Sequence, residues 1–234
     1  MSGALLRACV AAAALGLGAA EACETALVLA IDVSGSVDAA EYRLQMDGLT
    51  AALRDPNVRD ALVAAEAMIA VMQWSGANKQ EFTTSWTHVV SHEIADRLAG
   101  AVEAAPRAFQ HFSTAIGDAL AAAAVALGEV SGRCKRHVVD ISGDGVSNEG
   151  RDLPRIRDAL IRGGVQINGL AIEIGEEGLS EYYRREVIGG GGAFVLTARS
   201  FEDYPRAIRR KLLRELADPV VRLAPAIRLA DGGR

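Results

Sequence analysis

The sequence predicts a three-layer, doubly wound α/β fold: a mostly parallel six-stranded sheet with one antiparallel edge strand, covered by helices on both faces. Three observations predict it. Segments with the pattern of strands alternate along the chain with segments of helical periodicity. The first strand segment, 25–32, is apolar without interruption, as in a strand that is buried on both faces. Two later strand segments are joined by a short turn, which predicts the antiparallel pair.

The first strand leads into a helix. Residues 39–55 carry apolar side chains at helical spacing, and Asp38 stands three positions before Glu41, which is the pattern of a capping box. Residues 67–76 and 81–89 then form a hairpin around turn-forming residues. By the same two periodicities the remaining elements are helices at 91–105 and 114–130, a strand at 136–142, a helix at 153–162, a strand at 165–173, a helix at 180–187, a strand at 193–198 and a last helix at 201–216.

Length and charge limit the classes of function. The chain has 234 residues, of which 50% are hydrophobic and 24% charged, so one domain with a substantial core is expected. The formal net charge of -5 leaves no basic stripe that could neutralise phosphates. Nucleic acid is therefore not expected as a partner.

The first 22 residues have the layout of a signal peptide. Arg7 precedes an apolar stretch, 8–20, and the small residues Ala20 and Ala22 form an A-x-A cleavage site before Cys23. An uncleaved anchor is one alternative, although the apolar stretch falls short of the roughly 20 residues that a span needs. A lipoprotein with a lipidated cysteine is the other.

The expected mature protein is periplasmic or secreted and has no stable membrane span. It consists of one domain, 23–217, and a C-terminal tail, 218–234. Cys9 leaves with the signal peptide, so the mature chain keeps Cys23 and Cys134. An even number of cysteines in an oxidising compartment predicts a disulfide.

Three loops bring oxygen-bearing side chains to one edge of the predicted sheet. Asp32, Ser34 and Ser36 follow the first strand, Asp144 follows the strand at 136–142, and Thr114 stands at the start of a helix. In doubly wound sheets, ligands bind beyond the carboxyl ends of the strands. Carboxylates and hydroxyls are the ligands that hard divalent cations such as Mg²⁺ prefer, with about six oxygens around the ion.

These motifs resemble the metal-ion-dependent adhesion site of von Willebrand factor type A (vWA) domains. That site combines D-x-S-x-S after the first strand, a threonine in T-x-x-G-x-A-L, and an Asp-Gly pair after the fourth strand, and here all five metal positions are filled. The resemblance extends from about residue 25 to 216, and the chain is also similar to an uncharacterised family of exported bacterial vWA-like proteins. One departure is Gly143, which replaces the usual hydroxyl residue before the Asp-Gly pair and is expected to loosen that loop.

The resemblance implies a function. Ser34, Ser36 and Thr114 would bind a divalent cation directly, with Mg²⁺ as the first choice and Mn²⁺ or Ca²⁺ as alternatives. Asp32 and Asp144 would hold coordinating waters or bind according to state. An Asp or Glu of an unknown protein partner would complete the coordination sphere, so the expected function is that of a non-enzymatic binding module.

A metal-dependent hydrolase, for example a phosphoesterase using the same site, is the alternative function. It needs a general base or a nucleophile. The sequence has no G-x-S-x-G elbow and places no His or Cys at the three site loops. The sequence thus identifies no catalytic residue.

A simpler interpretation competes with the metal site. Ser, Thr and Asp are preferred at helix N-caps, so Ser36, Asp38 and Thr114 could each do no more than satisfy helix amides. Capping does not explain why Asp32, Ser34 and Asp144 collect at the same edge of the predicted sheet.

Two further predictions concern residues away from this edge. If the strands beginning near Cys23 and Cys134 are parallel neighbours, as the vWA strand order implies, the two sulfurs are nearly level and a bridge is within reach. The basic residues of the last helix are expected on its solvent-exposed face, with an anionic partner as the alternative; they are Arg206, Arg209, Arg210, Lys211 and Arg214.

Overall fold

The computed structural model describes residues 23–174 and 178–217. The predicted signal peptide, 1–22, and the tail, 218–234, lie outside the described residues. The strands are β1 (Cys23–Asp32), β2 (Met68–Trp74), β3 (Gln80–His88), β4 (Cys134–Gly143), β5 (Val165–Ile172) and β6 (Val195–Ala198). The helical elements are α1 (Ala39–Arg54), α2 (Pro56–Ala64), α3 (His92–Ala104), α4 (Ile116–Glu129), α5 (Leu153–Arg162), α6 (Leu179–Tyr182), the π-helical turn η1 (Tyr183–Val187) and α7 (Tyr204–Leu216).

The six strands form one sheet in the order β3-β2-β1-β4-β5-β6. Only β3 is antiparallel to its neighbour, and the other four pairings are parallel. The predicted mostly parallel sheet with one antiparallel edge strand is therefore confirmed. The strand order reverses between β1 and β4, which is where doubly wound folds bind their ligands.

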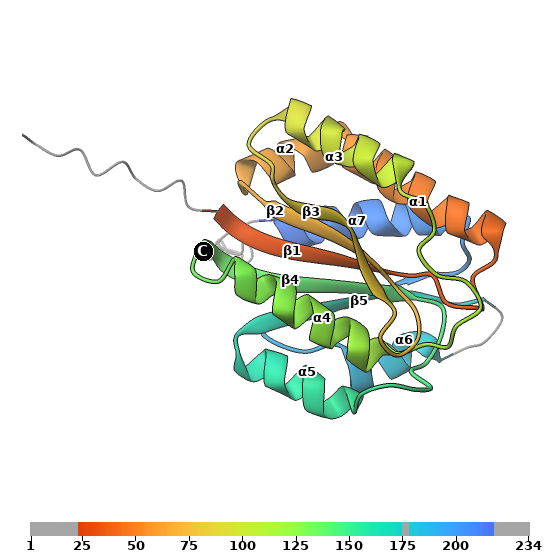
Figure 1. Cartoon of the computed structure of the whole chain (residues 1–234). Helices are drawn as coiled ribbons and strands as arrows, with labels where there is room; N and C mark the ends of the chain where they lie inside the picture. Colours follow the sequence, from red (N-terminus) through yellow and green to blue (C-terminus); the bar gives the residue numbers. More distant parts are fainter. Residues whose placement is uncertain (1–22, 175–177, 218–234) are drawn as a thin grey trace, which may run out of the picture.

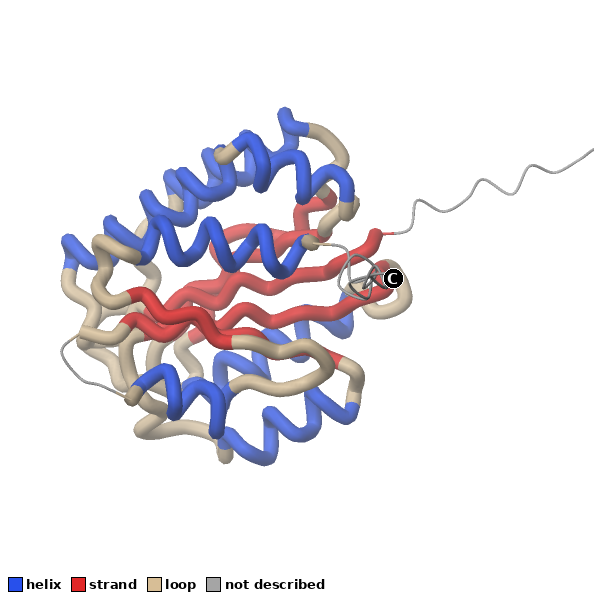
Figure 2. Tube along the Cα trace, turned by 180° about the vertical axis from the view of Figure 1, so that it is seen from behind, coloured by secondary structure: helices blue, strands red, loops and turns tan. Residues whose placement is uncertain are grey.

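Helices cover both faces of the sheet, as Figures 1 and 2 show. Alternate residues of β1 divide between two cores: Leu27, Leu29 and Ile31 pack with α1, α2, α3 and α7, whereas Val28 and Ala30 pack with α4, α5 and η1. The sheet is thus the middle of three layers. No helix among the described residues is long and apolar enough to cross a membrane.

The predicted disulfide is present. The β1–β4 register pairs Cys23 directly with Cys134, their Cα atoms lie 4.4 Å apart, and the two sulfurs are bonded. The bond joins the starting ends of the two central strands. In Figure 1 β1 begins at the left and runs to the right, so the disulfide and the carboxyl ends of the parallel strands lie at opposite edges of the sheet.

Side-chain caps mark the starts of the first two helices. Asp38 caps α1, and the Glu41 side chain accepts from the Asp38 amide, which confirms the capping box. The structure adds α2, which the periodicity analysis did not predict. Asp55 caps α2 and Pro56 occupies its first turn, a combination that favours a helix start.

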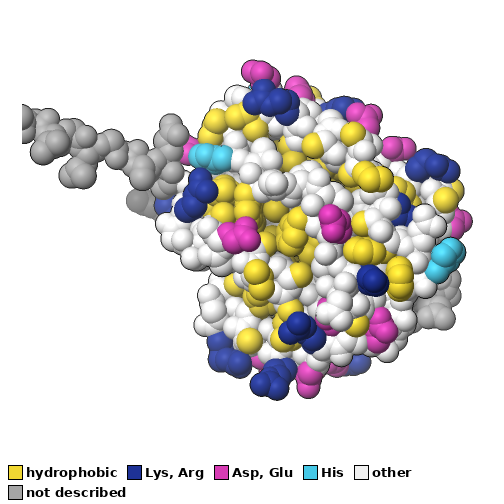
Figure 3. Space-filling model, in the orientation of Figure 1, with side chains coloured by type: hydrophobic (Ala, Val, Ile, Leu, Met, Phe, Trp, Pro, Cys, Tyr) yellow, Lys and Arg dark blue, Asp and Glu magenta, His cyan; other side chains and the backbone are white. Residues whose placement is uncertain are grey.

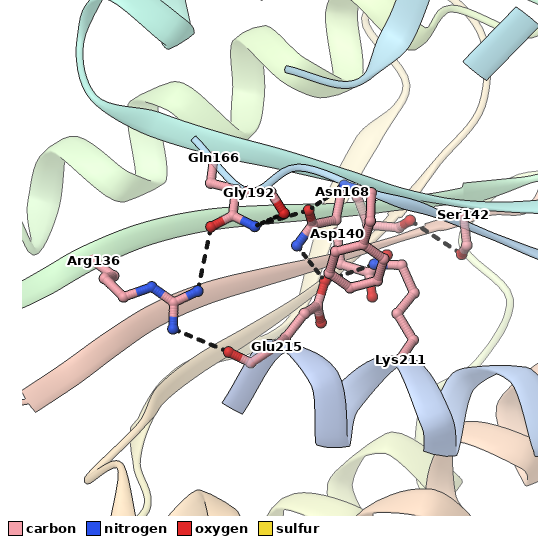
Figure 4. A network of polar contacts seen from close by, with 10 residues as sticks. Arg136, Asp140, Ser142, Gln166, Asn168, Gly192, Lys211 and Glu215 are labelled. Carbon is pink, nitrogen blue, oxygen red and sulfur yellow. Dashed lines mark hydrogen bonds and ion pairs between the residues drawn. The ribbon is translucent and has the colours of Figure 1, made fainter. Parts of the chain in front are cut away.

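A buried polar network ties α7 to the sheet (Figure 4). Lys211 of α7 is fully buried, and its Nζ lies 2.5 Å from Oδ1 of Asp140 on β4 and 2.6 Å from Oε1 of Glu215. Asn168 of β5 donates to the same Glu215 oxygen at 2.9 Å. Burial, and secondly the Glu215 carboxylate, raise the pKa of Asp140, while the Lys211 ammonium opposes the shift.

The prediction that Lys211 lies on the exposed face of the last helix is therefore wrong. Arg206 and Arg210 are exposed as expected, whereas Lys211 lies on the side of the helix that packs against the sheet. A lysine is tolerated there because two carboxylates compensate for its loss of hydration.

Away from the carboxyl edge of the sheet, hydrophobic side chains gather between β3 and α4 on the face shown in Figure 3. They line a groove of about 460 Å³ that includes Phe82, Trp86 and Val125. Val125 is 70% exposed. Because this β3–α4 groove lies away from the carboxyl edge of the sheet, a substitution in it can serve as a control for substitutions at that edge.

Candidate metal centre

The first predicted site residue ends the central strand. Asp32 is the last residue of β1 and is fully buried. Its Oδ1 accepts a 2.8 Å hydrogen bond from the Ser34 amide, whereas its Oδ2 is buried without a hydrogen-bond partner. A buried carboxylate oxygen that no donor satisfies is costly, so it identifies a place where a hydrogen-bond donor or a positive group would be stabilised.

The other four predicted residues gather next to it. Ser34 and Ser36 bring their hydroxyl oxygens to 3.2 Å, and Ser36 donates to Oδ1 of Asp144 at 2.7 Å. The Thr114 hydroxyl lies 3.4 Å from that of Ser34. Three loops that are far apart in the sequence therefore bring their hydroxyls and carboxylates together, as the sequence predicts.

Helix capping does not account for this cluster. Helix α4 has Ala115 at its N-cap position and no side-chain cap, so Thr114 does not serve as one. Ser36 directs its hydroxyl to Ser34 and Asp144 rather than to amides of α1. Of the three residues to which capping was assigned as the simpler role, only Asp38 has it.

The loop after β1 is held by a residue that sequence reasoning missed. A guanidinium nitrogen of Arg107 donates to the carbonyl oxygens of Val33, Ser34 and Val37 at 3.0, 3.0 and 2.6 Å. The Gly35 amide also donates to the Phe112 carbonyl at 2.8 Å. No local pattern marks Arg107, because its partners precede it by about 70 positions in the chain.

Thr114 is fixed by the loop that follows β4. Its amide donates to the Asn148 side chain at 3.0 Å, and the Asn148 amide donates back to the Thr114 carbonyl at 2.9 Å. This reciprocal pair holds the Thr114 loop against the Asp144 loop. Gly143 belongs to β4 and pairs with Ala171 of β5, so it lies in regular strand rather than in a loosened loop.

Burial raises the proton affinity of both carboxylates of the cluster. Burial, and secondly the Asp144 carboxylate, raise the pKa of Asp32 to about 7, against hydrogen bonds from Ser34 that lower it. Burial also raises the pKa of Asp144, while the hydrogen bond from Ser36 lowers it. A divalent cation between them would favour the charged forms of both.

The donor set fits a hard divalent cation. Asp32, Ser34 and Thr114 are buried, Asp144 is half-buried and Ser36 is exposed, so the cluster is closed on the protein side and open to solvent on the other. A cleft of about 470 Å³ begins at Ser36 and Asp144. Among residues 23–174 and 178–217 no group of three or more His, Cys, Asp or Glu side chains is arranged for a metal, so the cluster differs from the His- and Cys-rich sites that select softer ions.

Solved structures with the same fold are vWA domains. Proximal thread matrix protein 1 from the mussel byssus, whose structure has a zinc-occupied MIDAS motif, matches with a TM-score of 0.61 and 20% identity over 83% of this chain and 46% of its own. A von Willebrand factor type A protein from Catenulispora acidiphila has a TM-score of 0.59 and 19% identity, over 82% and 43% of the two chains. The pilus adhesin SpaC from Lactobacillus rhamnosus GG has a TM-score of 0.61 and 12% identity, over 84% and 31%.

The fold is therefore that of a vWA domain. This chain spans less than half of the length of each of these three proteins. Residues 22–220 match a family model described as "Protein of unknown function (DUF1194)", and the chain belongs to that family. No curated protein matches the chain.

Proposed function

We propose that this protein is an exported binding module that holds a divalent cation at its carboxyl sheet edge and binds an acidic side chain of a protein partner there. The cation would be held by Asp32, Ser34, Ser36, Thr114 and Asp144. The observation that carries the proposal is the convergence of these five oxygen-bearing side chains, from three loops far apart in the sequence, at one partly open place.

The composition of the cluster favours binding of an outside carboxylate. Three of the five donors are neutral hydroxyls, and the two carboxylates balance only the ion's own charge. A bound Mg²⁺ would supply an electrophilic position on the side where Ser36 is exposed. Ser34, Thr114 and Asp32 close the protein side, so a partner can approach from the solvent side only.

The surface around the opening suits a protein partner. Phe112, Val146 and Ile174 are 43%, 49% and 47% exposed. The Phe112 carbonyl contacts the Gly35 amide, and Val146 and Ile174 line the same cleft as Asp144. Exposed apolar side chains around a polar centre are typical of protein-binding sites, so the partner's acidic residue is expected to have apolar neighbours.

Two comparisons and the disulfide support the proposal. The mussel protein has a zinc-occupied MIDAS motif, and SpaC is a pilus adhesin. Disulfides persist in oxidising compartments, so the Cys23–Cys134 bond favours a periplasmic or secreted protein. Mg²⁺ remains the first choice of ion, with Mn²⁺ and Ca²⁺ as alternatives.

Affinity capture tests the proposal. The mature protein is immobilised and exposed to exported proteins of its host in Mg²⁺ or in chelator. We expect a partner that is retained in Mg²⁺, released by chelator and lost with Thr114→Ala. Val146→Asp should also weaken capture, while Val125→Asp, on the β3–α4 groove, should not. Capture that is equal in Mg²⁺ and chelator would contradict the proposal.

An activity screen separates this function from the hydrolase alternative. Phosphate esters and carboxylate esters are incubated with the protein in Mg²⁺ and in Mn²⁺. We expect no turnover. Turnover by the wild type that is absent in Asp32→Ala would show that the site is catalytic, and it would overturn the proposed binding function.

A further inference from the structure

Gly143 leaves a small volume beside the candidate metal centre, immediately before Asp144. A Cβ on Gly143 would lie 2.7 Å from Oδ2 of Asp32 and 2.8 Å from the hydroxyl oxygen of Tyr183. Both distances are too short for real contacts of a Cβ atom. The missing side chain therefore allows a carboxylate oxygen and a phenol oxygen to converge on the same place.

The Tyr183 side chain is closely packed, with its hydroxyl at this place. Tyr183 is fully buried and packs in the core with α4 and α5. A Cβ on Gly169 would lie 2.8 Å from its ring, so a second glycine makes room for the ring. Gly169 pairs with Ile141, two residues before Gly143, and the two glycines thus share one face of the sheet.

The backbone at Tyr183 is also unusual. Tyr183 opens the π-helical turn η1, and the Ile188 amide donates to its carbonyl at 2.9 Å. Single π-helical turns occur frequently at functional sites, where they redirect a side chain. Here the turn accompanies a tyrosine whose hydroxyl lies beside Asp32.

The two converging atoms have complementary chemistry. Oδ2 of Asp32 and the Tyr183 hydroxyl are both buried, and neither has a hydrogen-bond partner. A phenol donates and a carboxylate oxygen accepts. Each group alone would carry the cost of burial without a partner, whereas together they can satisfy each other directly or through one water.

We infer that Tyr183 is a positioning residue of the metal centre: its phenol satisfies Oδ2 of Asp32, directly or through one water, and fixes the orientation of that carboxylate. The inference rests on the proposed function for its metal part only, because the Tyr183–Asp32 contact can be measured without metal. Groups that orient a metal ligand typically change metal affinity by about 10-fold to 100-fold when they are removed.

A double-mutant cycle in chelator tests the contact. Urea unfolding at pH 8 is measured for the wild type, Asp32→Asn, Tyr183→Phe and the double variant, with the disulfide intact. Because a hydrogen bond to a charged group is stronger than one between neutral groups, we expect the two changes to be coupled by about 10-fold in the unfolding equilibrium constant. Additive effects would overturn the inference.

Titration with Mg²⁺ tests the positioning role. We expect Tyr183→Phe to weaken Mg²⁺ binding by about 10-fold. Tyr204→Phe is the matched control, because Tyr204 is equally buried and packs on the other face of the sheet. It should leave Mg²⁺ affinity unchanged.

The outcomes separate this inference from the proposed function. In one outcome the two changes are coupled in chelator, but the wild type binds no Mg²⁺, Mn²⁺ or Ca²⁺. This result would support the Tyr183–Asp32 contact and would overturn both the metal site and the positioning role. Mg²⁺ binding that is unchanged in Tyr183→Phe would overturn the positioning role and leave the proposed function standing.

Discussion

Replacement of Lys211 by methionine tests the buried network between α7 and the sheet. The change keeps an unbranched side chain of similar length and removes the positive charge that lies 2.5 Å from Asp140 and 2.6 Å from Glu215. All three side chains are at most 2% exposed. Removing one partner of a buried ion pair costs about 3–5 kcal/mol, because the remaining charge is left without compensation.

This cost should depend on pH. The pKa of Asp140 is raised in the folded protein above its ordinary value, so its contribution to stability is complete at low pH and is lost as the pH rises through the raised value. Without the Lys211 ammonium, which lowers that pKa, the loss becomes larger. We therefore expect the difference in free energy of unfolding between wild type and Lys211→Met to be small near about pH 5 and to reach the full 3–5 kcal/mol near about pH 8.

Urea unfolding in chelator, with the disulfide intact, measures the effect. A slope of about 2 kcal/mol per molar urea converts a 4 kcal/mol loss into a midpoint lower by about 2 M. Arg210→Met is the matched control, since Arg210 is exposed on the same helix, and it should change the free energy of unfolding by less than about 0.5 kcal/mol. The triple variant Asp140→Asn, Lys211→Met, Glu215→Gln should recover most of the loss, because no buried charge is left.

Two results would refute the reasoning. One is a loss below about 1 kcal/mol for Lys211→Met at about pH 8, which would show that the ammonium does not stabilise the buried carboxylates. The other is an equal loss at both pH values, which would assign the effect to packing rather than to charge.

Three further predictions concern the metal centre and the disulfide. Burial and Asp144 raise the pKa of Asp32 to about 7, so protons compete with the cation for this carboxylate. Mg²⁺ affinity measured by calorimetry should therefore fall as the pH drops below about 7 and level off above it. An affinity that is constant from about pH 5 to 8 would contradict this. Thr114→Ala removes a hydroxyl that would bind the ion directly, so it should weaken Mg²⁺ binding by at least about 100-fold, the upper end of the effect of groups that only orient a ligand. In chelator it should cost less than about 1 kcal/mol of unfolding free energy, since Thr114 does not cap α4. The Cys23–Cys134 bond joins residues with a sequence separation of 111, so its reduction should lower the free energy of unfolding by about 4–5 kcal/mol. Equal thiol counts in the denatured protein with and without reductant would show that the bond is absent in solution.

Local patterns in the sequence were sufficient for most of the architecture. The alternation of strand and helix periodicities identified all six strands, and the topological rule placed Asp32, Ser34, Ser36, Thr114 and Asp144 at one sheet edge. Helix α2 was missed although Asp55 and Pro56 carry a recognisable start signal, because the preceding helical pattern was continued to residue 55.

Residues whose roles depend on distant partners were not predictable in this way. Lys211 stands among four arginines, and only the packing of α7 against β4 and β5 shows that it is buried next to Asp140. Arg107 has no motif, and its role follows from carbonyl groups of the loop after β1. Tyr183 lies in a π-helical turn, for which helical periodicity gives no signal.

The sequence by itself determined the order and type of the elements, the pair of cysteines and the five oxygen-bearing side chains, because strand alternation, helix periodicity and turn residues express preferences of neighbouring residues along the chain. The tertiary structure alone decided that Thr114 faces Ser34 rather than capping its helix, that Gly143 and Gly169 admit Tyr183 beside Asp32, and that Lys211 is buried. These features depend on which distant groups meet in a close-packed interior and on whether each buried polar group finds a partner there.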